Sequence, residues 1–412
     1  MPFPTQDVEV VRGLATRVAE FAALPVQQQK VDMWRRHNRL ERVKPMILIF
    51  PEGSWREALP DSVLQCTDPF CRGYERDLRM RLYHAEILKD DNVTDGKLYS
   101  PIVIRDSGWG VGASTTRPEQ ATGAAHYEAV IQTEADAVKI KKPQIRVDAA
   151  ETERLHQQAS ELIGGIMPVA KRGACHMGFA IIDALAQWRC LDQIYLDMVD
   201  RPEWLHGVLD FMTTAMLERL DALERQGGLS LNNGPEYCGS GGVGFSTELP
   251  QRDFDGKRVR AIDLWGFATT QMFSEVSPAM HDEFALTYEK RWLSRFGLNA
   301  YGCCEALHRK LDDVFKIPRL RRISMSPWVD MTVSAEKLGN RYVFSRKPNP
   351  AIVAGMAWDP DYVRRTIRDD LEKTRGCIVE LILKDTHTCQ NQPQRLADWV
   401  RIAKEEAETF AG

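Results

Sequence analysis

The pattern of apolar and polar positions becomes regular from about residue 150 onward, where short apolar runs alternate with longer amphipathic segments. Short apolar runs bounded by turn residues are typical of buried strands, and segments with an apolar repeat of about 3.6 residues are typical of helices. The pattern predicts strands at 165–171, 228–232, 259–264, 298–302, 321–325, 342–345 and 377–384. It predicts helices at 150–163, 181–200, 203–226, 278–296, 306–314, 330–338, 359–373 and 394–410.

The first 150 residues show a less regular mixture of elements. Helices are predicted at 8–23, 27–43 and 69–88, and strands at 44–50 and 98–104. Asp68 and Pro69 suit the N-cap and the first position of the 69–88 helix, because an Asp side chain accepts from free backbone N–H groups and proline has no N–H to satisfy. Ser277 and Pro278 predict a second helix start of the same kind.

Alternating strands and helices indicate a parallel sheet, for which a closed barrel and an open doubly wound sheet are the competing architectures. A dinucleotide-binding doubly wound sheet would carry a glycine-rich turn between a strand and a helix. The segment GSGGVG at 239–244 is rich in glycine, but no clear helical pattern follows it. We therefore expect an α/β fold with a (β/α)8 TIM barrel over 151–412. Residues 1–150 are expected to form a mixed α/β N-terminal extension that packs on the barrel and contributes to the substrate pocket.

Composition narrows the class of protein. The chain has 412 residues, of which 43% are hydrophobic and 27% charged, with a net charge of −4 and no basic block suited to nucleic acid. No apolar run reaches the roughly 18–20 residues that a membrane span needs, and the first residues lack the order of a signal peptide. We expect a cytoplasmic protein without nucleic-acid or membrane partners, and the sequence leaves a homodimer open.

Nine cysteines lie at irregular spacing, at positions 66, 71, 175, 190, 238, 303, 304, 377 and 389. An odd number of irregularly spaced cysteines argues against a secreted disulfide framework. In a reducing compartment such thiols are buried small hydrophobes, metal ligands or nucleophiles.

The position of these cysteines relative to the predicted strands selects the candidates for chemistry. In a barrel, catalytic groups come from the carboxyl ends of the strands and from the loops that follow them. Cys303 and Cys304 follow one predicted strand, and His387 and Cys389 follow another. Thiolate and imidazole ligands suit zinc, and catalytic zinc has three protein ligands and one open position. The alternative interpretation is that adjacent cysteines only pack as small hydrophobic side chains.

Several of these segments resemble the uroporphyrinogen decarboxylase superfamily. SPAMHDEF at 277–284 and FGLNAYGCC at 296–304 resemble its stretch S-P-e-x-x-x-e-F followed by G-v-x-x-x-H-x-C. YVFSRKPNP at 342–350 resembles its v-l-x-G-N-x-x-P strand. Residues 377–400, which include Thr388, Cys389 and Pro393, resemble its last strand, loop and helix. The similarity covers about residues 160–405 and rests on order and pattern more than on identity.

The resemblance implies one of two chemistries. The decarboxylases carry an arginine-rich N-terminal motif for the carboxylates of a tetrapyrrole, and the comparable strand here, MILIFPEGS at 46–54, has no arginine. The corrinoid-dependent methyltransferases of the superfamily hold zinc through His-x-Cys after one strand and Cys after the last. Cys303 and Cys389 match the two cysteines, but Tyr301 occupies the histidine position. The third ligand implied by the resemblance is then His387, with Glu305, Glu236 and Cys304 as alternatives.

We therefore predict an enzyme that moves a methyl group between a small donor, with an aromatic methyl ether favoured, and the cobalt of a corrinoid. The sequence has no Asp-x-His-x-x-Gly cobalamin motif, so the corrinoid is expected on a separate partner protein. The cobalt carries the difficult chemistry, and zinc is expected as a Lewis acid. The alternatives are a metal-free decarboxylase-like lyase and a non-catalytic barrel that binds a corrinoid or tetrapyrrole.

The residues predicted for the site fall into three groups. The candidate catalytic residues are Glu236, Tyr301, Glu305 and His387. The candidate substrate-binding residues, mostly aromatics that would shape a flat apolar pocket, are Tyr237, Trp265, Phe267, Trp328 and His176. The candidate zinc ligands are Cys303, Cys389 and His387.

Overall fold

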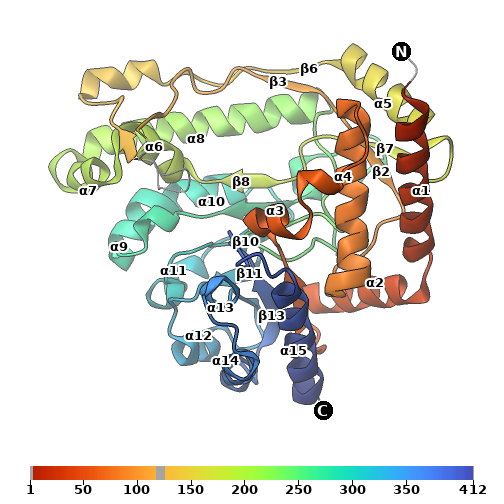
Figure 1. Cartoon of the computed structure of the whole chain (residues 1–412). Coiled ribbons are helices and arrows are strands. Elements are labelled where there is room, and N and C mark those ends of the chain that lie inside the picture. The colour runs from red at the N-terminus through yellow and green to blue at the C-terminus, as the bar shows by residue number, and fades with distance from the viewer. Residues whose placement is uncertain (1–2, 117–125, 412) are drawn as a thin grey trace.

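A computed structural model describes residues 3–116 and 126–411. Its centre is a parallel sheet of seven strands in the order β1-β13-β12-β11-β10-β9-β8 (Figure 1). The strands are β1 (Met46–Ile49), β8 (Met177–Phe179), β9 (Trp265–Ala268), β10 (Leu298–Tyr301), β11 (Leu320–Met325), β12 (Val343–Arg346) and β13 (Ile378–Leu383). The prediction of a mixed α/β fold with a parallel sheet is confirmed.

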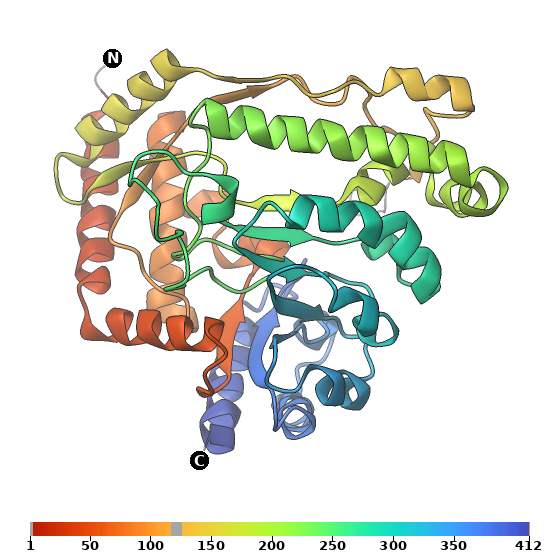
Figure 2. The same cartoon turned by 180° about the vertical axis from the view of Figure 1, so that it is seen from behind.

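Helices follow most of these strands and lie along the outside of the sheet (Figures 1 and 2). They are α1 (Thr5–Ala22), α2 (Pro25–Asn38), α3 (Trp55–Ala58), α4 (Pro69–Tyr83), α5 (Ala149–Ile163), α6 (Ile181–Arg189), α7 (Leu191–Asp200), α8 (Pro202–Arg225), α9 (Pro278–His281), α10 (Thr287–Leu293), α11 (Leu311–Val314), α12 (Met331–Leu338), α13 (Ala351–Ala354), α14 (Pro360–Lys373) and α15 (Gln394–Ala411). None of the helices within the described ranges combines the length and apolar character that crossing a bilayer requires.

Both predicted helix starts are confirmed. The Asp68 carboxylate accepts hydrogen bonds from the backbone N–H groups of Phe70 and Cys71, and Pro69 is the first residue of α4. The Ser277 hydroxyl accepts from the backbone of Met280 at the start of α9. Two strand predictions are wrong. The segment 259–264 contains a short 3-10 helix, Ala261–Asp263, and the strand begins at Trp265. The predicted run therefore ends just before β9 (Trp265–Ala268) begins. The segment 228–232 makes only an isolated bridge, at Leu229.

The N-terminal region supplies one edge of the sheet. Met46–Ile49 of β1 pair in parallel with Glu380–Leu383 of β13, so residues 1–150 contribute a strand to the main sheet. On the outer side of β1, the backbone N–H of Ile47 donates to the Asp91 carboxylate at 2.8 Å, and that of Ile49 donates to Asp90 at 3.3 Å. These carboxylates accept hydrogen bonds from backbone N–H groups that would otherwise pair with a further strand at this edge of the sheet.

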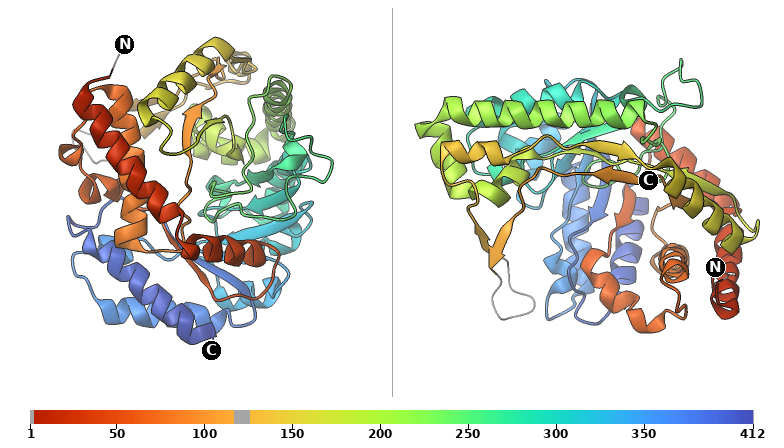
Figure 3. Two further views of the ribbon diagram at one scale, coloured as in Figure 1. Left: turned by 90° about the vertical axis from the view of Figure 1, so that its right-hand side faces the viewer. Right: turned by 90° about the horizontal axis from the view of Figure 1, so that it is seen from above.

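Shorter pairs of strands lie beside the main sheet. β2 (Leu98–Pro101) and β7 (Val169–Arg172) form a parallel pair, and an isolated bridge joins Ala174 to Leu229. β3 (Ile104–Asp106) pairs with β6 (Ile145–Val147), and β4 (Ser114–Thr116) pairs with β5 (His126–Glu128), in both cases antiparallel (Figure 3). Because the described strands link β1 to β13 but not to β2, closure into a complete eight-stranded barrel stays a prediction.

The two faces of the sheet bury different partners, as expected from the two-residue repeat of a strand. Ile47, Ile49, Ile323, Phe344 and Leu383 belong to the large core cluster that also contains helix residues. Met46, Leu48 and Ile382 face the other way. They pack against Val243 of the glycine-rich segment 239–244, against Phe245, which follows it, and against Trp34 of α2.

A buried polar network lies on this second face. The Glu380 carboxylate accepts from the Ser345 hydroxyl, lies 2.9 Å from Arg322 Nε and lies 3.1 Å from His37 Nε2. A Cβ atom on Gly242, which has a φ of +86°, would lie 2.7 Å from Arg322 Cζ, so only glycine lets the chain approach this closely. The glycine-rich segment therefore packs against the sheet interior, and its glycines serve that close approach.

Candidate active site at the carboxyl end of the sheet

Two adjacent thiols follow β10 at the carboxyl end of the sheet. Gly302 adopts a φ of +87°, and a Cβ there would lie 2.5 Å from Leu307 Cδ1. This sharp turn places Cys303 Sγ 3.6 Å from Cys304 Sγ. Cys304 is exposed and Cys303 is half-buried. The hydrogen bond from the Cys303 thiol lowers the pKa of Cys304, although burial opposes this effect, and raises the pKa of Cys303.

Glu305 holds the turn that carries these thiols. Its side chain is fully buried and accepts from the backbone N–H of Cys303 at 2.7 Å and from the Thr269 hydroxyl at 2.8 Å. The carbonyl of Cys303 accepts from the Ser324 hydroxyl at 3.1 Å. Glu305, predicted as a catalytic residue, is therefore placed as a positioning residue for Cys303.

A positive charge lies beside the thiols. Lys384 directly follows β13 and is 9% exposed. Burial would lower its pKa, but Tyr237 and Cys303, followed by Asp385 and Glu52, together raise the pKa of Lys384 above the ordinary value of a lysine. At neutral pH the Tyr237 phenol and the Cys303 thiol keep their protons, so the carboxylates of Asp385 and Glu52 are the neighbours that favour the ammonium form of Lys384. Its nearest carboxylate is Asp385, with Nζ 3.6 Å from Oδ1.

Three of the predicted substrate-binding residues meet next to Lys384. The ring centroid of His176 lies 5.6 Å from that of Tyr237 and 5.7 Å from that of Phe267. Phe50, which follows β1, packs edge-on against Tyr237 at 5.1 Å. Burial raises the pKa of Tyr237, so its phenol keeps its proton at neutral pH. The rings give the site an apolar wall with a phenol O–H at its edge.

The other predicted residues lie apart from this group. Tyr301 is buried, and its hydroxyl donates to Glu289 of α10 at 2.8 Å. Trp265 is buried at the start of β9 and donates to the Gly244 carbonyl at 2.9 Å. Trp328 is 67% exposed. Glu236 forms an ion pair with Arg172, with Oε1 2.7 Å from Nη2.

The predicted zinc ligands are not assembled in this structure. Among residues 3–116 and 126–411, no three or more His, Cys, Asp or Glu side chains are placed to hold one metal ion. The Cys389 thiol is buried and donates to Glu57 Oε2 at 2.9 Å. His387 is exposed in the same loop, and its backbone packs on Gly53, where a Cβ would lie 2.8 Å from His387 Cα. Zinc therefore stays a prediction, and the residues present do not fit the expected three-ligand set.

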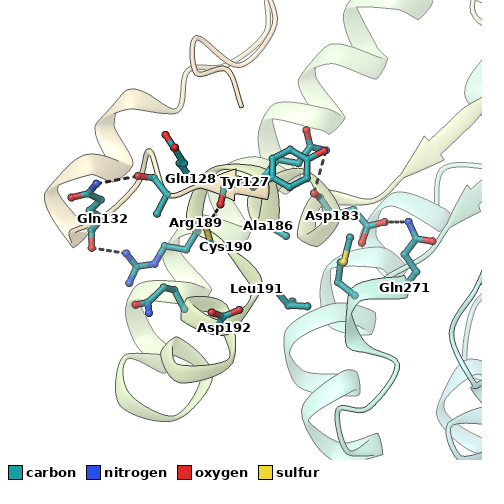
Figure 4. A pocket seen from close by; sticks show the side chains of 14 residues that line it. Tyr127, Glu128, Gln132, Asp183, Ala186, Arg189, Cys190, Leu191, Asp192 and Gln271 are labelled. Atoms are coloured by element: carbon teal, nitrogen blue, oxygen red, sulfur yellow. Dashed lines mark hydrogen bonds between the residues drawn. The ribbon is translucent and has the colours of Figure 1, made fainter. Parts of the chain in front are cut away.

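A cavity of about 790 Å³ lies beyond the carboxyl ends of β8 and β9. Its lining includes Tyr127, Gln132, Asp183, Arg189, Asp192 and Gln271 (Figure 4). The Asp183 carboxylate accepts from Gln271 Nε2 at 2.9 Å. Burial raises the pKa of Asp183 to about 6, and the nearby charge of Glu305 adds to the effect. The cavity therefore contains a carboxyl group that changes its charge near neutral pH.

Sequence reasoning did not select Lys384 or Asp183 as functional residues. Lys384 is the last residue of the strand predicted at 377–384, so its position at the carboxyl end of that strand was a signal. Asp183 lies in the first turn of α6, and only the folded chain brings Gln271 and the cavity to it.

Comparison with known proteins gives similarities of structure but none of sequence. No protein-family model matches the chain, and no curated protein matches it in sequence. A solved structure, a methyltransferase from Methanosarcina mazei, superposes with a TM-score of 0.47 and 11% identity, covering 90% of this chain and 97% of that chain.

Proposed function

We propose that this chain is a methyltransferase that acts at the carboxyl end of its parallel sheet and takes the methyl group of a small methyl ether. The observation that carries the proposal is the Lys384 ammonium, held beside Tyr237, Cys303 and Cys304 at the place where barrel-type enzymes put their chemistry. A corrinoid on a separate protein supplies the cobalt that exchanges the methyl group, as the sequence resemblance implies.

The difficult event in ether demethylation is the departure of the oxygen. As the carbon–oxygen bond breaks, its electron pair stays on the oxygen, which becomes an alkoxide or phenolate. A fixed ammonium in a partly buried site stabilises that developing charge more strongly than water does, because it needs no reorganisation. Lys384 would supply this charge, and the Tyr237 phenol would donate a hydrogen bond to the same oxygen.

The aromatic group next to Lys384 supports an apolar donor. His176, Tyr237 and Phe267 present ring faces and edges that pack well against a flat ring. An aromatic methyl ether would place its ring among these side chains and its oxygen toward Lys384. This orientation requires no metal ligand, and no step of the proposal depends on zinc.

The test is a methyl-transfer assay with the purified full-length chain. Reduced free cobalamin and a series of aromatic and aliphatic methyl ethers are the substrates, and methylcobalamin formation is followed by its absorbance. We expect turnover with at least one aromatic ether. Release of carbon dioxide from a carboxylated tetrapyrrole without methyl transfer would favour the decarboxylase-like alternative. Tight cobalamin binding with no turnover of any ether would favour the non-catalytic alternative.

A further inference from the structure

We propose that Cys303 and Cys304 form a two-thiol chelate for a trivalent organic arsenical, a binding activity that does not depend on methyl transfer. The pair lies at an accessible turn, with its two sulfur atoms 3.6 Å apart and with Cys304 exposed. Both thiols can therefore reach one incoming atom without movement of the backbone.

The sulfur separation selects the geometry of the bound atom. If one atom bonds both sulfurs at about 2.3 Å, a typical metal–thiolate length, a sulfur–sulfur distance of 3.6 Å corresponds to an S–atom–S angle of roughly 100°. A linear two-coordinate ion would need the sulfurs about twice the bond length apart, so this pair does not suit it. The angle suits a pyramidal centre with three bonds and one lone pair, which is the geometry of trivalent arsenic.

The number of available ligands separates arsenic from zinc. Zinc sites in proteins use three or four protein ligands, and the described residues provide no group of three around any point. The neighbouring Glu305 carboxylate already accepts from Thr269 and from the Cys303 backbone. Two thiols fill two of the three valences of a monosubstituted arsenical, whose organic substituent fills the third. The site is therefore complete with the two cysteines alone.

Charges of both signs lie near the pair, since Lys384 favours thiolate at both cysteines whereas Glu305, and at Cys304 also Asp385, oppose it. The reaction is therefore argued from the placement of the two sulfur atoms and from its own balance. An arsenical with two hydroxyl groups forms two sulfur–arsenic bonds and loses two arsenic–oxygen bonds. The two thiol protons leave with the hydroxyls as two water molecules. Arsenic stays trivalent, so the step needs no oxidant or reductant.

The experiment uses the full-length chain and phenylarsine oxide. We expect native mass spectrometry to show one phenylarsenic unit per chain, removable by a small dithiol. Cys303→Ser and Cys304→Ser should each weaken binding by at least about 100-fold, because the second bond forms at high effective concentration only when both thiols are present. Thermal unfolding of each variant verifies that it is folded.

Cys190→Ser is the matched control. Cys190 is half-buried, and its thiol donates to the Tyr127 carbonyl. Because Cys190 is far in sequence from Cys303 and Cys304, removing its thiol should leave arsenical binding unchanged. Retention of wild-type affinity by either Cys303→Ser or Cys304→Ser would overturn the proposal. Stoichiometric zinc that blocks phenylarsine oxide would also overturn it, because the pair would then belong to a zinc site. Methyl transfer is not a readout, so failure of the proposed function leaves this test intact.

Discussion

The thiol of Cys389 donates a hydrogen bond to the carboxylate of Glu57, with Sγ 2.9 Å from Oε2. The same oxygen accepts from the backbone N–H groups of Cys389 at 2.9 Å and Asn391 at 2.7 Å. Glu57 lies in α3 after β1, and Cys389 lies in the loop after β13. One carboxylate therefore joins the two loops at this end of the sheet, and the cysteine acts as a donor to it.

Glu57→Ala is expected to destabilise the chain more than Cys389→Ser does. The alanine leaves three donors without their acceptor, which costs about 1–3 kcal/mol for groups that stay buried. The serine hydroxyl can still donate to Glu57, so we expect a loss of less than about 1 kcal/mol. Urea unfolding of the two variants measures the difference. Equal losses would show that the carboxylate does not organise the loop.

The Glu57 carboxylate also gives a prediction for the stability of the fold at low pH. Burial would raise the pKa of Glu57, but hydrogen bonds from Cys389, Thr388 and the loop backbone lower it to about 2, from the ordinary value of 4.5. An acid with a depressed folded-state pKa stabilises the fold above its unfolded pKa and loses that contribution as the pH falls. The wild type should lose stability between pH 4.5 and about 2 through this group. Glu57→Ala should show a shallower loss in the same window.

Asp183 has the opposite dependence on pH. Burial raises its pKa from 3.8 to about 6, so the folded chain binds a proton more tightly than the unfolded chain. Stability through this group should therefore fall as the pH rises from about 4 to about 6 and stay lower above that range. Asp183→Asn removes the charge, while its side-chain carbonyl can still accept from Gln271.

We expect Asp183→Asn to be more stable than the wild type at pH 8, by an amount of the order of 1–2 kcal/mol after allowance for partial exposure. The advantage should disappear near pH 4, where the wild-type carboxyl group is neutral in the folded chain. Thermal unfolding across this pH range gives the comparison. A constant difference at every pH would mean that Asp183 does not titrate as its surroundings imply.

Much of the fold could be predicted from local signals. The strands β10 to β13 and the helix starts at Pro69 and Pro278 follow from apolar runs and capping residues, which act within a few positions of the chain. β9 was misplaced because the apolar run around Leu264 continues into it without a turn residue. The edge of β1 could not be predicted, because its partners Asp90 and Asp91 depend on tertiary placement.

The candidate site was predicted only in part, for the same physical reason. Strand order places Cys303, Cys304 and Lys384 at one end of the sheet, so their position follows from the sequence. The separation of side chains does not, because it depends on loop geometry. The turn at Gly302 brings two thiols together, whereas Glu57 holds Cys389 in another hydrogen bond. Sequence spacing cannot distinguish these two outcomes.

The buried Glu380 network predicts a large stability effect within the sheet. Glu380 is fully buried, and although burial alone would raise its pKa, Arg322 and His37 lower the pKa to about 2. Glu380→Ala would leave Arg322 as a buried charge without its carboxylate partner, which typically costs about 3–5 kcal/mol. Urea unfolding measures this loss. The double variant Glu380→Ala with Arg322→Met should recover part of it, because no unpaired charge remains; no recovery would contradict an ion pair at this position.

Lys384→Met offers the sharpest test of the proposed chemistry. Removing one preorganised group that stabilises developing negative charge typically lowers kcat by about 10²–10³, and methionine keeps most of the side-chain volume. The loss should be greater for ethers whose leaving oxygen is more basic, because those transition states carry more charge on oxygen. Lys384→Arg should retain part of the activity, since it keeps the charge.

Lys316→Met, at an exposed lysine paired with Asp313, is the control and should match the wild type. Rates measured over a series of substituted aromatic ethers give the dependence on leaving group. If the variant loses the same fraction of kcat with every ether, Lys384 acts in binding or folding, and the proposal that it stabilises the departing oxygen is contradicted.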